Sequence, residues 1–248
     1  MRALITGASS GMGRDMAKYL SKLGYDLVLV ARRKELLEEV KKDISTNCEI
    51  EVMDVSKVEN CKKLFEKYRT VELLINNAGF GLFGEFWTTD IDTGINMIDT
   101  NIKAVHVLTR LYVEEMQKRN NGKILNVGSI AGFMTGPLMS EYYATKNYVV
   151  ELSSGINKEL KKAKSNVSIS VFCPGPVQTN FNNVANVKFA TKGITSDYAS
   201  KYAIDKFLEG KEIIIPGLSI KILYLLNKIL PRNIMSEFAY NTQSSKRK

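Results

Sequence analysis

The chain has 248 residues, of which 44% are hydrophobic and 25% charged, a composition typical of a soluble protein long enough for one α/β domain. The formal net charge is +9, but the 35 basic residues are spread along the chain without an aromatic-studded basic stripe, so we expect no nucleic acid partner. Three cysteines without a CxxC pair argue against a disulfide scaffold and indicate a reducing, cytoplasmic compartment.

No targeting or membrane-spanning segment is predicted. Met1 runs almost directly into the apolar residues 3–5, which are too few for the apolar core of a signal peptide. The longest apolar stretch, residues 220–230, is interrupted by two lysines and an asparagine, so we do not expect it to cross a membrane.

The first predicted unit is a strand over residues 2–6, a glycine-rich turn with Gly7, Gly11 and Gly13, and a helix over residues 12–23. Strand, glycine turn and helix open the dinucleotide-binding fold, in which a pyrophosphate lies at the helix N-terminus. The spacing is G-x-x-x-G-x-G rather than G-x-G-x-x-G. A tight strand–helix turn without a ligand is the alternative interpretation.

The second predicted strand, residues 27–31, is followed by Arg32 and Arg33. An NAD site usually places an acidic residue here, whereas the first one in this chain is Glu35, inside the next predicted helix. Two arginines suit the 2′-phosphate of NADP, because the guanidinium fork matches phosphate geometry. Arg32 is the stronger candidate, since alternation along the strand end would point Arg33 into solvent. A solvated helix start is the alternative.

The rest of the chain continues this alternation, which predicts an α/β fold with a single doubly wound parallel sheet of about seven strands and helices on both faces. Ligands of such a sheet bind beyond the carboxyl ends of its strands. We expect a cofactor half over residues 1–125, a catalytic and substrate half over 126–217, and a helical extension over 218–248. The remaining predicted helices cover residues 34–46, 57–68, 90–119, 142–162 and 196–209, and the strands 49–53, 73–76, 123–127, 167–172 and 211–215.

Tyr142 and Lys146 lie one turn apart on the predicted helix over 142–162. A free tyrosine titrates at about 10, and a nearby ammonium favours the phenolate, so the pair could donate and accept a proton. A solvated surface pair is the alternative. Tyr143 points about 100° away toward Asn147, so we expect it to be a packing or pocket residue.

Five motifs occur in a fixed order: Thr6-Gly7-Ala8-Ser9-Ser10-Gly11-Met12-Gly13, Asn76-Asn77-Ala78-Gly79, Ser129, Tyr142-Tyr143-Ala144-Thr145-Lys146 and Pro174-Gly175-Pro176-Val177-Gln178-Thr179. In these motifs the chain resembles the classical short-chain dehydrogenase/reductase family. The resemblance runs from residue 2 to about residue 180. Met12 stands where the family usually has Ile or Leu, and Gly128 where many relatives have Ser.

The resemblance implies four catalytic residues: Asn101, Ser129, Tyr142 and Lys146. Tyr142 would supply a proton and Ser129 would bind the carbonyl oxygen. Lys146 would lower the pKa of Tyr142 and hold the nicotinamide ribose, and Asn101 would anchor a water that relays protons. The implied cofactor-binding residues are Gly7, Ser9, Ser10, Gly11, Met12, Gly13, Arg32, Arg33, Asp54, Val55, Asn77, Ala78, Gly79, Tyr142, Lys146, Pro174, Gly175, Val177 and Thr179.

The implied activity is hydride transfer between NADP(H) and a carbonyl or secondary alcohol, with 3-oxoacyl, steroid and other ketone substrates all compatible. A non-catalytic NADP(H)-binding regulator is the alternative, although such proteins tend to lose the Tyr or the Lys. The resemblance also implies a homodimer or homotetramer. We expect no metal site, because His106 is the only histidine and no second ligand lies at a suitable spacing, and we interpret His106 as a structural or interface residue.

The C-terminal third is less informative. An apolar set could form a substrate lid or pack on its own core: Phe181, Val184, Val187 and Phe189. Residues 218–230 form a predicted amphipathic helix, and the chain ends in the basic run Lys246-Arg247-Lys248. We expect this helix to cap the substrate pocket or to lie at a subunit interface, in preference to a peripheral membrane contact.

Overall fold

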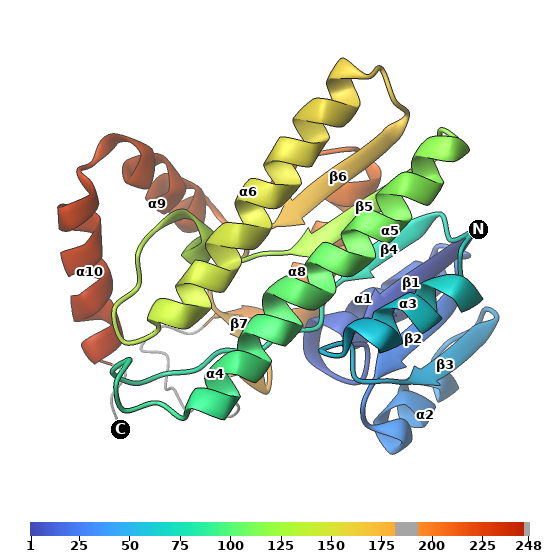
Figure 1. The fold of residues 1–248 in the computed structure, drawn as a ribbon, viewed down its shortest axis with the longest axis horizontal. Helices are drawn as coiled ribbons and strands as arrows, with labels where there is room; N and C mark the ends of the chain where they lie inside the picture. The colour runs from blue at the N-terminus through green and yellow to red at the C-terminus, as the bar shows by residue number, and fades with distance from the viewer. Residues whose placement is uncertain (182–192, 246–248) are drawn as a thin grey trace.

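A seven-stranded sheet forms the centre of the protein in the computed structural model, which describes residues 1–181 and 193–245 (Figure 1). The strand order is β3-β2-β1-β4-β5-β6-β9 and every neighbouring pair is parallel. The predicted doubly wound parallel sheet is confirmed. The strands are β1 (Arg2–Thr6), β2 (Asp26–Ala31), β3 (Cys48–Val52), β4 (Leu73–Asn76), β5 (Gly122–Val127), β6 (Val167–Phe172) and β9 (Ile213–Ile214).

The central strands are apolar on both faces. In β1, Ala3, Leu4 and Ile5 are all fully buried. Leu4 packs on one side of the sheet in a cluster with Val28, whereas Ala3 and Ile5 pack on the other side in a cluster with Leu29. A strand that is covered on both faces needs a continuous apolar run, which explains why the run at residues 3–5 forms a central strand.

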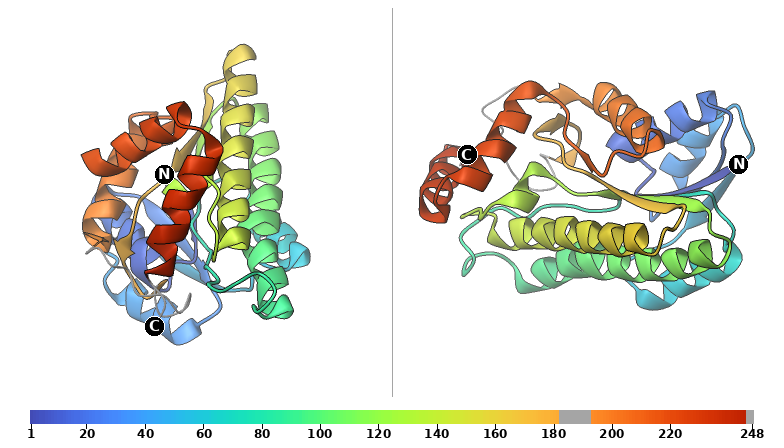
Figure 2. Two further views of the ribbon diagram at one scale, coloured as in Figure 1. Left: turned by 90° about the vertical axis from the view of Figure 1, so that its left-hand side faces the viewer. Right: turned by 90° about the horizontal axis from the view of Figure 1, so that it is seen from above.

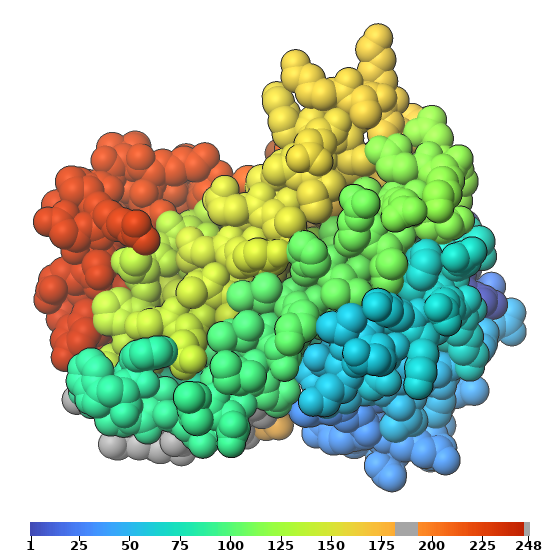
Figure 3. All heavy atoms as spheres, viewed as in Figure 1, coloured from blue at the N-terminus to red at the C-terminus, as the bar shows by residue number. Residues whose placement is uncertain are grey.

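Helices cover both faces of the sheet, and Figure 2 shows the resulting three layers. The helices on one face are α1 (Gly11–Lys22), α2 (Lys34–Lys42) and α8 (Ser196–Leu208). The helices on the other face are α3 (Val58–Lys67), α5 (Ala104–Lys118) and α6 (Ser140–Lys162). The outer sides of α5 and α6 lie next to each other on the surface of the molecule (Figure 3).

The predicted long helix over residues 90–119 is divided. It consists of α4 (Ile91–Ile98), the π-helical segment η1 (Asp99–Lys103) and α5. The side chain of Asn101, in the middle of η1, hydrogen-bonds both the amide and the carbonyl of Phe80. We attribute the wider π turn to this tertiary contact, because such turns commonly occur where a helix accommodates a functional side chain.

Helix α2 ends at Lys42, four residues before the predicted end. The next residues bond to α1 instead: the amide of Ser45 and the hydroxyl of Thr46 both donate to the hydroxyl of Ser21. Strand β9 is also shorter than predicted, with only residues 213–214 in the ladder. Short-range propensity does not reveal the contacts with Ser21 that replace the last turn of α2.

Small elements complete the described chain. They are the 3₁₀ turn η2 (Ile130–Phe133), the two-stranded sheet of β7 (Val177–Gln178) and β8 (Ile194–Thr195), and the helices α9 (Leu218–Ile229) and α10 (Arg232–Ser244). Helix α10 was not predicted. The lid positions Val184, Val187 and Phe189 and the basic run 246–248 lie outside the described residues. No helix within the described ranges is long and apolar enough to cross a membrane.

Candidate functional site

The turn between β1 and α1 is too tight for any side chain at two glycines. Gly7 has a φ of +67°, in the left-handed region that glycine occupies most readily. A Cβ on Gly13 would lie 2.4 Å from the carbonyl oxygen of Gly7. The backbone of this turn is therefore bare, and an approaching ligand can reach its amide groups directly.

The N-terminus of α1 is open to an anion. Its N-cap, Ser10, makes no side-chain hydrogen bond to the helix, and the first turn contains no acidic residue. The first amides of a helix and its dipole favour negative charge. Thr179, which follows β7, packs against this turn, because a Cβ on Gly11 would be 3.2 Å from the methyl group of Thr179. This cradle fits the pyrophosphate of a dinucleotide.

Arg33 reaches back over this turn. Its Nη2 donates to the hydroxyl oxygens of Ser9 and Ser10, each at 3.2 Å. The side chain of Arg32 is exposed and makes no hydrogen bond within the described parts of the chain. Arg33 is also exposed, but it follows the end of β2 as the N-cap of α2, and its guanidinium points to the glycine turn.

The end of β4 is tied to the end of β1. The amides of Asn77 and Ala78 donate to the hydroxyl of Thr6 at 3.0 and 3.1 Å. The side-chain amide of Asn77 donates to the carbonyls of Thr6 and Gly7. Thr6 was not predicted as a site residue, although its position immediately before Gly7 at a strand end was a usable signal. These bonds fix the turn to the centre of the sheet.

Asp54 and Val55 follow β3, on the same edge of the sheet as the glycine turn. The carboxylate of Asp54 accepts from the amide of Ser56 at 3.0 Å, and Asn60 donates to the carbonyl of Asp54. Val55 is buried. The local bonds therefore hold Asp54 and Val55 in a fixed turn.

The motif after β6 lies against two other elements. The carbonyl of Pro174 accepts from the amide of Ile130 in η2 at 2.9 Å. A Cβ on Gly175 would lie 2.6 Å from Ile220 of α9, and Val177 begins β7. The motif thus connects the segment after Ser129 with the C-terminal helices.

Asn101 is completely buried. Its Nδ2 donates to the carbonyl of Phe80 at 2.9 Å and to the hydroxyl of Thr145 at 3.1 Å, and its Oδ1 accepts from the amide of Phe80 at 3.1 Å. A Cβ on Gly79 would be 2.9 Å from Asn101 Oδ1 and 3.5 Å from Lys146 Nζ. Gly79 therefore allows these two side chains to lie close together, and Thr145 is a further partner that was not predicted.

Lys146 is buried, with 6% of its surface exposed. Its Nζ donates to the carbonyl of Val127 at 2.8 Å and lies 5.9 Å from the ring centroid of Tyr142. Burial lowers the pKa of Lys146 from 10.5 to about 8, because the charged form loses its solvation. The end of β5 thus supplies the polar group that holds this ammonium in place.

Burial raises the pKa of Tyr142 well above its ordinary value of 10, and a hydrogen bond with the side chain of Ser129 offsets only part of that rise. The expectation that Lys146 lowers this pKa stays a prediction. The ammonium is directed at Val127, and desolvation is the larger effect. The phenol of Tyr142 is consequently protonated at neutral pH.

Tyr143 does not share the position of Tyr142. Its hydroxyl accepts a 2.6 Å hydrogen bond from Gln243 of α10, and its ring lies over Gly136, where a Cβ would be 2.3 Å from the ring. The ring centroid of Phe181 lies 5.4 Å from that of Tyr142. The ring of Tyr142 therefore has two aromatic neighbours, Tyr143 and Phe181.

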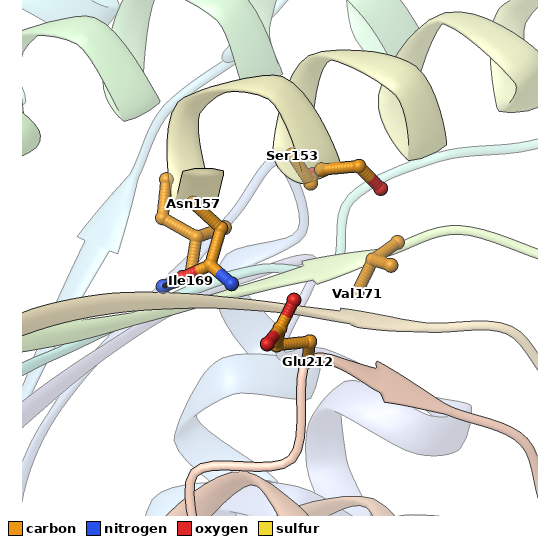
Figure 4. Close-up of a pocket in the computed structure, with 6 residues that line it drawn as sticks. Ser153, Asn157, Ile169, Val171 and Glu212 are labelled. Carbon is orange, nitrogen blue, oxygen red and sulfur yellow. Dashed lines mark hydrogen bonds between the residues drawn. The ribbon is translucent and has the colours of Figure 1, made fainter. Parts of the chain in front are cut away.

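Two other features lie apart from the four proposed catalytic residues. His106 Nδ1 is 2.7 Å from the hydroxyl of Tyr148, which links α5 to α6. Figure 4 shows a small pocket against β6 that has no room for a water molecule. The hydroxyl of Ser153 there donates to the carbonyl of Val149. The residues labelled around this pocket are Ser153, Asn157, Ile169, Val171 and Glu212.

Comparison with known proteins gives consistent results. The profile of the family described as short chain dehydrogenase matches residues 1–190. Human dehydrogenase/reductase SDR family member 7 is 32% identical over 210 residues, which cover 79% of this chain but only 62% of that protein. The NADP-dependent 3-hydroxy acid dehydrogenase of Schizosaccharomyces pombe is 34% identical over 191 residues, 73% of each chain.

The solved structures that match have the same fold. A short-chain dehydrogenase from Sphingobium yanoikuyae in complex with NADPH aligns with a TM-score of 0.83 at 27% identity, over 94% of both chains. Solved neighbours include complexes with NADPH and with NAD.

Proposed function

Since the chain belongs to the short-chain dehydrogenase/reductase family, an oxidoreductase family, we propose that it transfers hydride between NADP(H) and a carbonyl or secondary alcohol. The observation that carries this proposal is the arrangement of Tyr142 and Lys146 one helical turn apart on α6, with the buried Nζ of Lys146 5.9 Å from the ring centroid of Tyr142. Ser129 lies close enough to lower the pKa of Tyr142. Asn101 completes the set from η1.

Bound NADPH would supply the hydride. When a carbonyl carbon accepts hydride, its oxygen needs a proton and a hydrogen-bond donor. Tyr142 suits the first role, because a phenol is protonated at neutral pH and burial raises the pKa of this one further. Ser129 suits the second role, because its hydroxyl oxygen is held by the amide of Ala131 at 3.1 Å and a hydroxyl can donate while it accepts. In the oxidative direction the phenolate of Tyr142 would act as the base.

Lys146 and Asn101 would act around this pair. The ammonium of Lys146 is buried beside the ring of Tyr142 and is available to the cofactor ribose and to a developing phenolate. Asn101 uses both amide hydrogens within the protein, so its side chain holds Phe80 and Thr145 in position, and only its acceptor oxygen has capacity left for a water.

The cofactor preference follows from charge at the glycine turn. The guanidinium of Arg33 lies beside Ser9 and Ser10, and the first acidic residue after β2 is Glu35 in α2. A fixed guanidinium favours the extra phosphate of NADP. We assign Arg33 the principal role and Arg32 a supporting one.

A second candidate function is an NADP(H) sensor without turnover. The intact set of Asn101, Ser129, Tyr142 and Lys146 argues against it. The test is a panel of 3-oxoacyl, steroid and simple ketones with NADPH and with NADH, followed by loss of nicotinamide absorbance. We expect turnover with NADPH. Tight NADPH binding without oxidation of NADPH by any carbonyl, and without reduction of NADP by the matching alcohols, would favour the sensor.

A further inference from the structure

Helix α9 exposes an aliphatic face. None of its twelve residues is buried, and five large aliphatic side chains lie within an arc of about 100° on the side away from the protein. Scattered exposed leucines need no explanation, but a continuous stripe on one helix does. The five residues, which we call the α9 face, are Leu218, Ile222, Leu225, Leu226 and Ile229, with 43–78% of their surfaces exposed.

The opposite side of α9 is already packed. Ile220 fills the space beside Gly175, and the ring of Tyr224 meets that of Phe133 edge to face at 4.6 Å. The side chain of Asn227 donates to the carbonyl of Phe133. These contacts fix the rotation of α9 about its own axis. The α9 face therefore points away from the protein, because the opposite side of the helix is the one that packs.

The charges around the α9 face are positive. Lys221 and Lys228 border the stripe, and α9 contains no acidic residue. Neither lysine forms an ion pair with another described residue; Lys228 lies instead over the ring of Tyr224 at 4.4 Å. Residues 218–248 contain six basic side chains and a single acidic one, Glu237.

We propose that α9, against the sequence-based expectation of a pocket cap or a subunit interface, docks through this face on the surface of an anionic lipid bilayer. A helix of twelve residues is about 18 Å long, whereas the hydrocarbon core is about 30 Å thick, so α9 would lie along the interface and not across it. An apolar stripe bordered by lysines is the pattern of such interfacial helices. Headgroup phosphates would pair with Lys221 and Lys228.

A second copy of this chain suits the α9 face less well. If two copies packed through the α9 face, Lys221 and Lys228 of both copies would lie near one another. Helix α9 has no carboxylate that could pair with these four lysines. Helix α10 also exposes apolar side chains, since Ile234 and Phe238 lie one turn apart and each is about half exposed. Both helices lie at the end of the molecule toward which β5 and β6 point (Figures 1 and 2).

The test is sedimentation of the full chain with vesicles of phosphatidylcholine, with and without about 30% phosphatidylserine. Wild type is expected to pellet with the anionic vesicles and to be released by raised salt. Leu226→Glu is expected to weaken this binding by about tenfold or more. Leu23→Glu is the matched control, because Leu23 is also 43% exposed and lies at the end of α1.

A second pair of variants avoids any change to apolar packing. Lys221→Ala and Lys228→Ala are each expected to weaken binding about fivefold, whereas Lys22→Ala at the end of α1 leaves it unchanged. Wild type that stays in the supernatant with anionic vesicles would overturn the proposal, as would equal effects of Leu226→Glu and Leu23→Glu. If vesicles are not bound and Leu226→Glu lowers the sedimenting mass, the face is a contact between copies of the chain.

Discussion

The side-chain amide of Gln243 donates a 2.6 Å hydrogen bond to the hydroxyl of Tyr143, the residue next to the proposed proton donor. Gln243 is on α10, only two residues before the last described residue, yet only 3% of its surface is exposed. The ring of Tyr143 in turn lies against Gly136. This bond links α10 to a residue that lies beside the candidate active site.

Breaking this bond is expected to cost stability through both partners. Gln243→Leu and Tyr143→Phe should each lower the free energy of unfolding by about 1 kcal/mol. The double variant should lose about 0.5–1.5 kcal/mol less than the sum of the two single losses, because both variants remove the same bond. Denaturant unfolding measures all three free energies. Asn241→Leu, on the exposed side of the same helix, is the control, with a change of less than about 0.5 kcal/mol. Strict additivity of the two losses would show that the bond contributes nothing.

Lys146 should reduce stability in a pH-dependent manner. Its pKa of about 8 in the folded protein lies below the ordinary 10.5, so between these values the unfolded chain binds more protons and stability rises with pH. Below pH 8 both states are protonated, and the cost of burying the ammonium is complete. Lys146→Met should therefore raise the free energy of unfolding by about 1–2 kcal/mol at pH 7. Loss of the hydrogen bond to the carbonyl of Val127 offsets part of this gain.

That gain should shrink as the pH rises from 8 to 10.5. The measurement is a series of urea titrations across this range. Lys162→Met, at the exposed end of the same helix, should show no such dependence. A gain in Lys146→Met that is constant with pH would contradict the burial effect.

Much of the fold could be predicted because its signals are local. Runs such as Ala3–Ile5 are continuous, and a glycine or polar turn follows almost every strand, which is enough to predict a parallel sheet. The order of the motifs then located Ser129, Tyr142 and Lys146, which the structure brings together. The spacing of four residues was sufficient to choose Tyr142 over Tyr143 as the neighbour of Lys146.

The remaining features depend on contacts distant in sequence. The π turn at Asn101 arises from bonds to Phe80, and the low pKa of Lys146 from burial, neither of which a sequence pattern shows. The orientation of Arg33 depends on where β2 ends and α2 begins. Helix α10 had a usable signal that was missed: Pro231 precedes a run with Ile234, Met235, Phe238 and Ala239 at helical spacing.

Arg33→Ala should weaken NADPH binding by about ten- to a hundredfold and leave NADH binding nearly unchanged. The reason is that a charge-assisted hydrogen bond is worth about 1.5–3 kcal/mol and only NADP carries the 2′-phosphate. Arg32→Ala is the matched neighbour and should have a smaller effect. Titration of both cofactors against the three proteins measures this. Equal affinity of the wild type for NADH and NADPH would contradict the assignment.

The protein should be a homodimer or homotetramer. The outer sides of α5 and α6 lie together on the surface (Figure 3). The side chains of His106 and Tyr148 connect the two helices. The sheet cannot cover these sides, and such helices provide extended surfaces for a second copy. Sedimentation velocity at micromolar concentration should show a species of at least twice 27.8 kDa. A sample that contains only the 27.8 kDa species would rule this out.

The most direct test of the proposed chemistry compares Tyr142→Phe with Tyr143→Phe, using a carbonyl that the wild type reduces with NADPH. Tyr142→Phe keeps the ring and removes only the proton donor, so turnover should fall by about 100- to 10,000-fold while NADPH affinity stays nearly the same. Tyr143→Phe should retain most of its turnover. Equal losses in the two variants, or loss only in Tyr143→Phe, would contradict the assignment of Tyr142 as the proton donor.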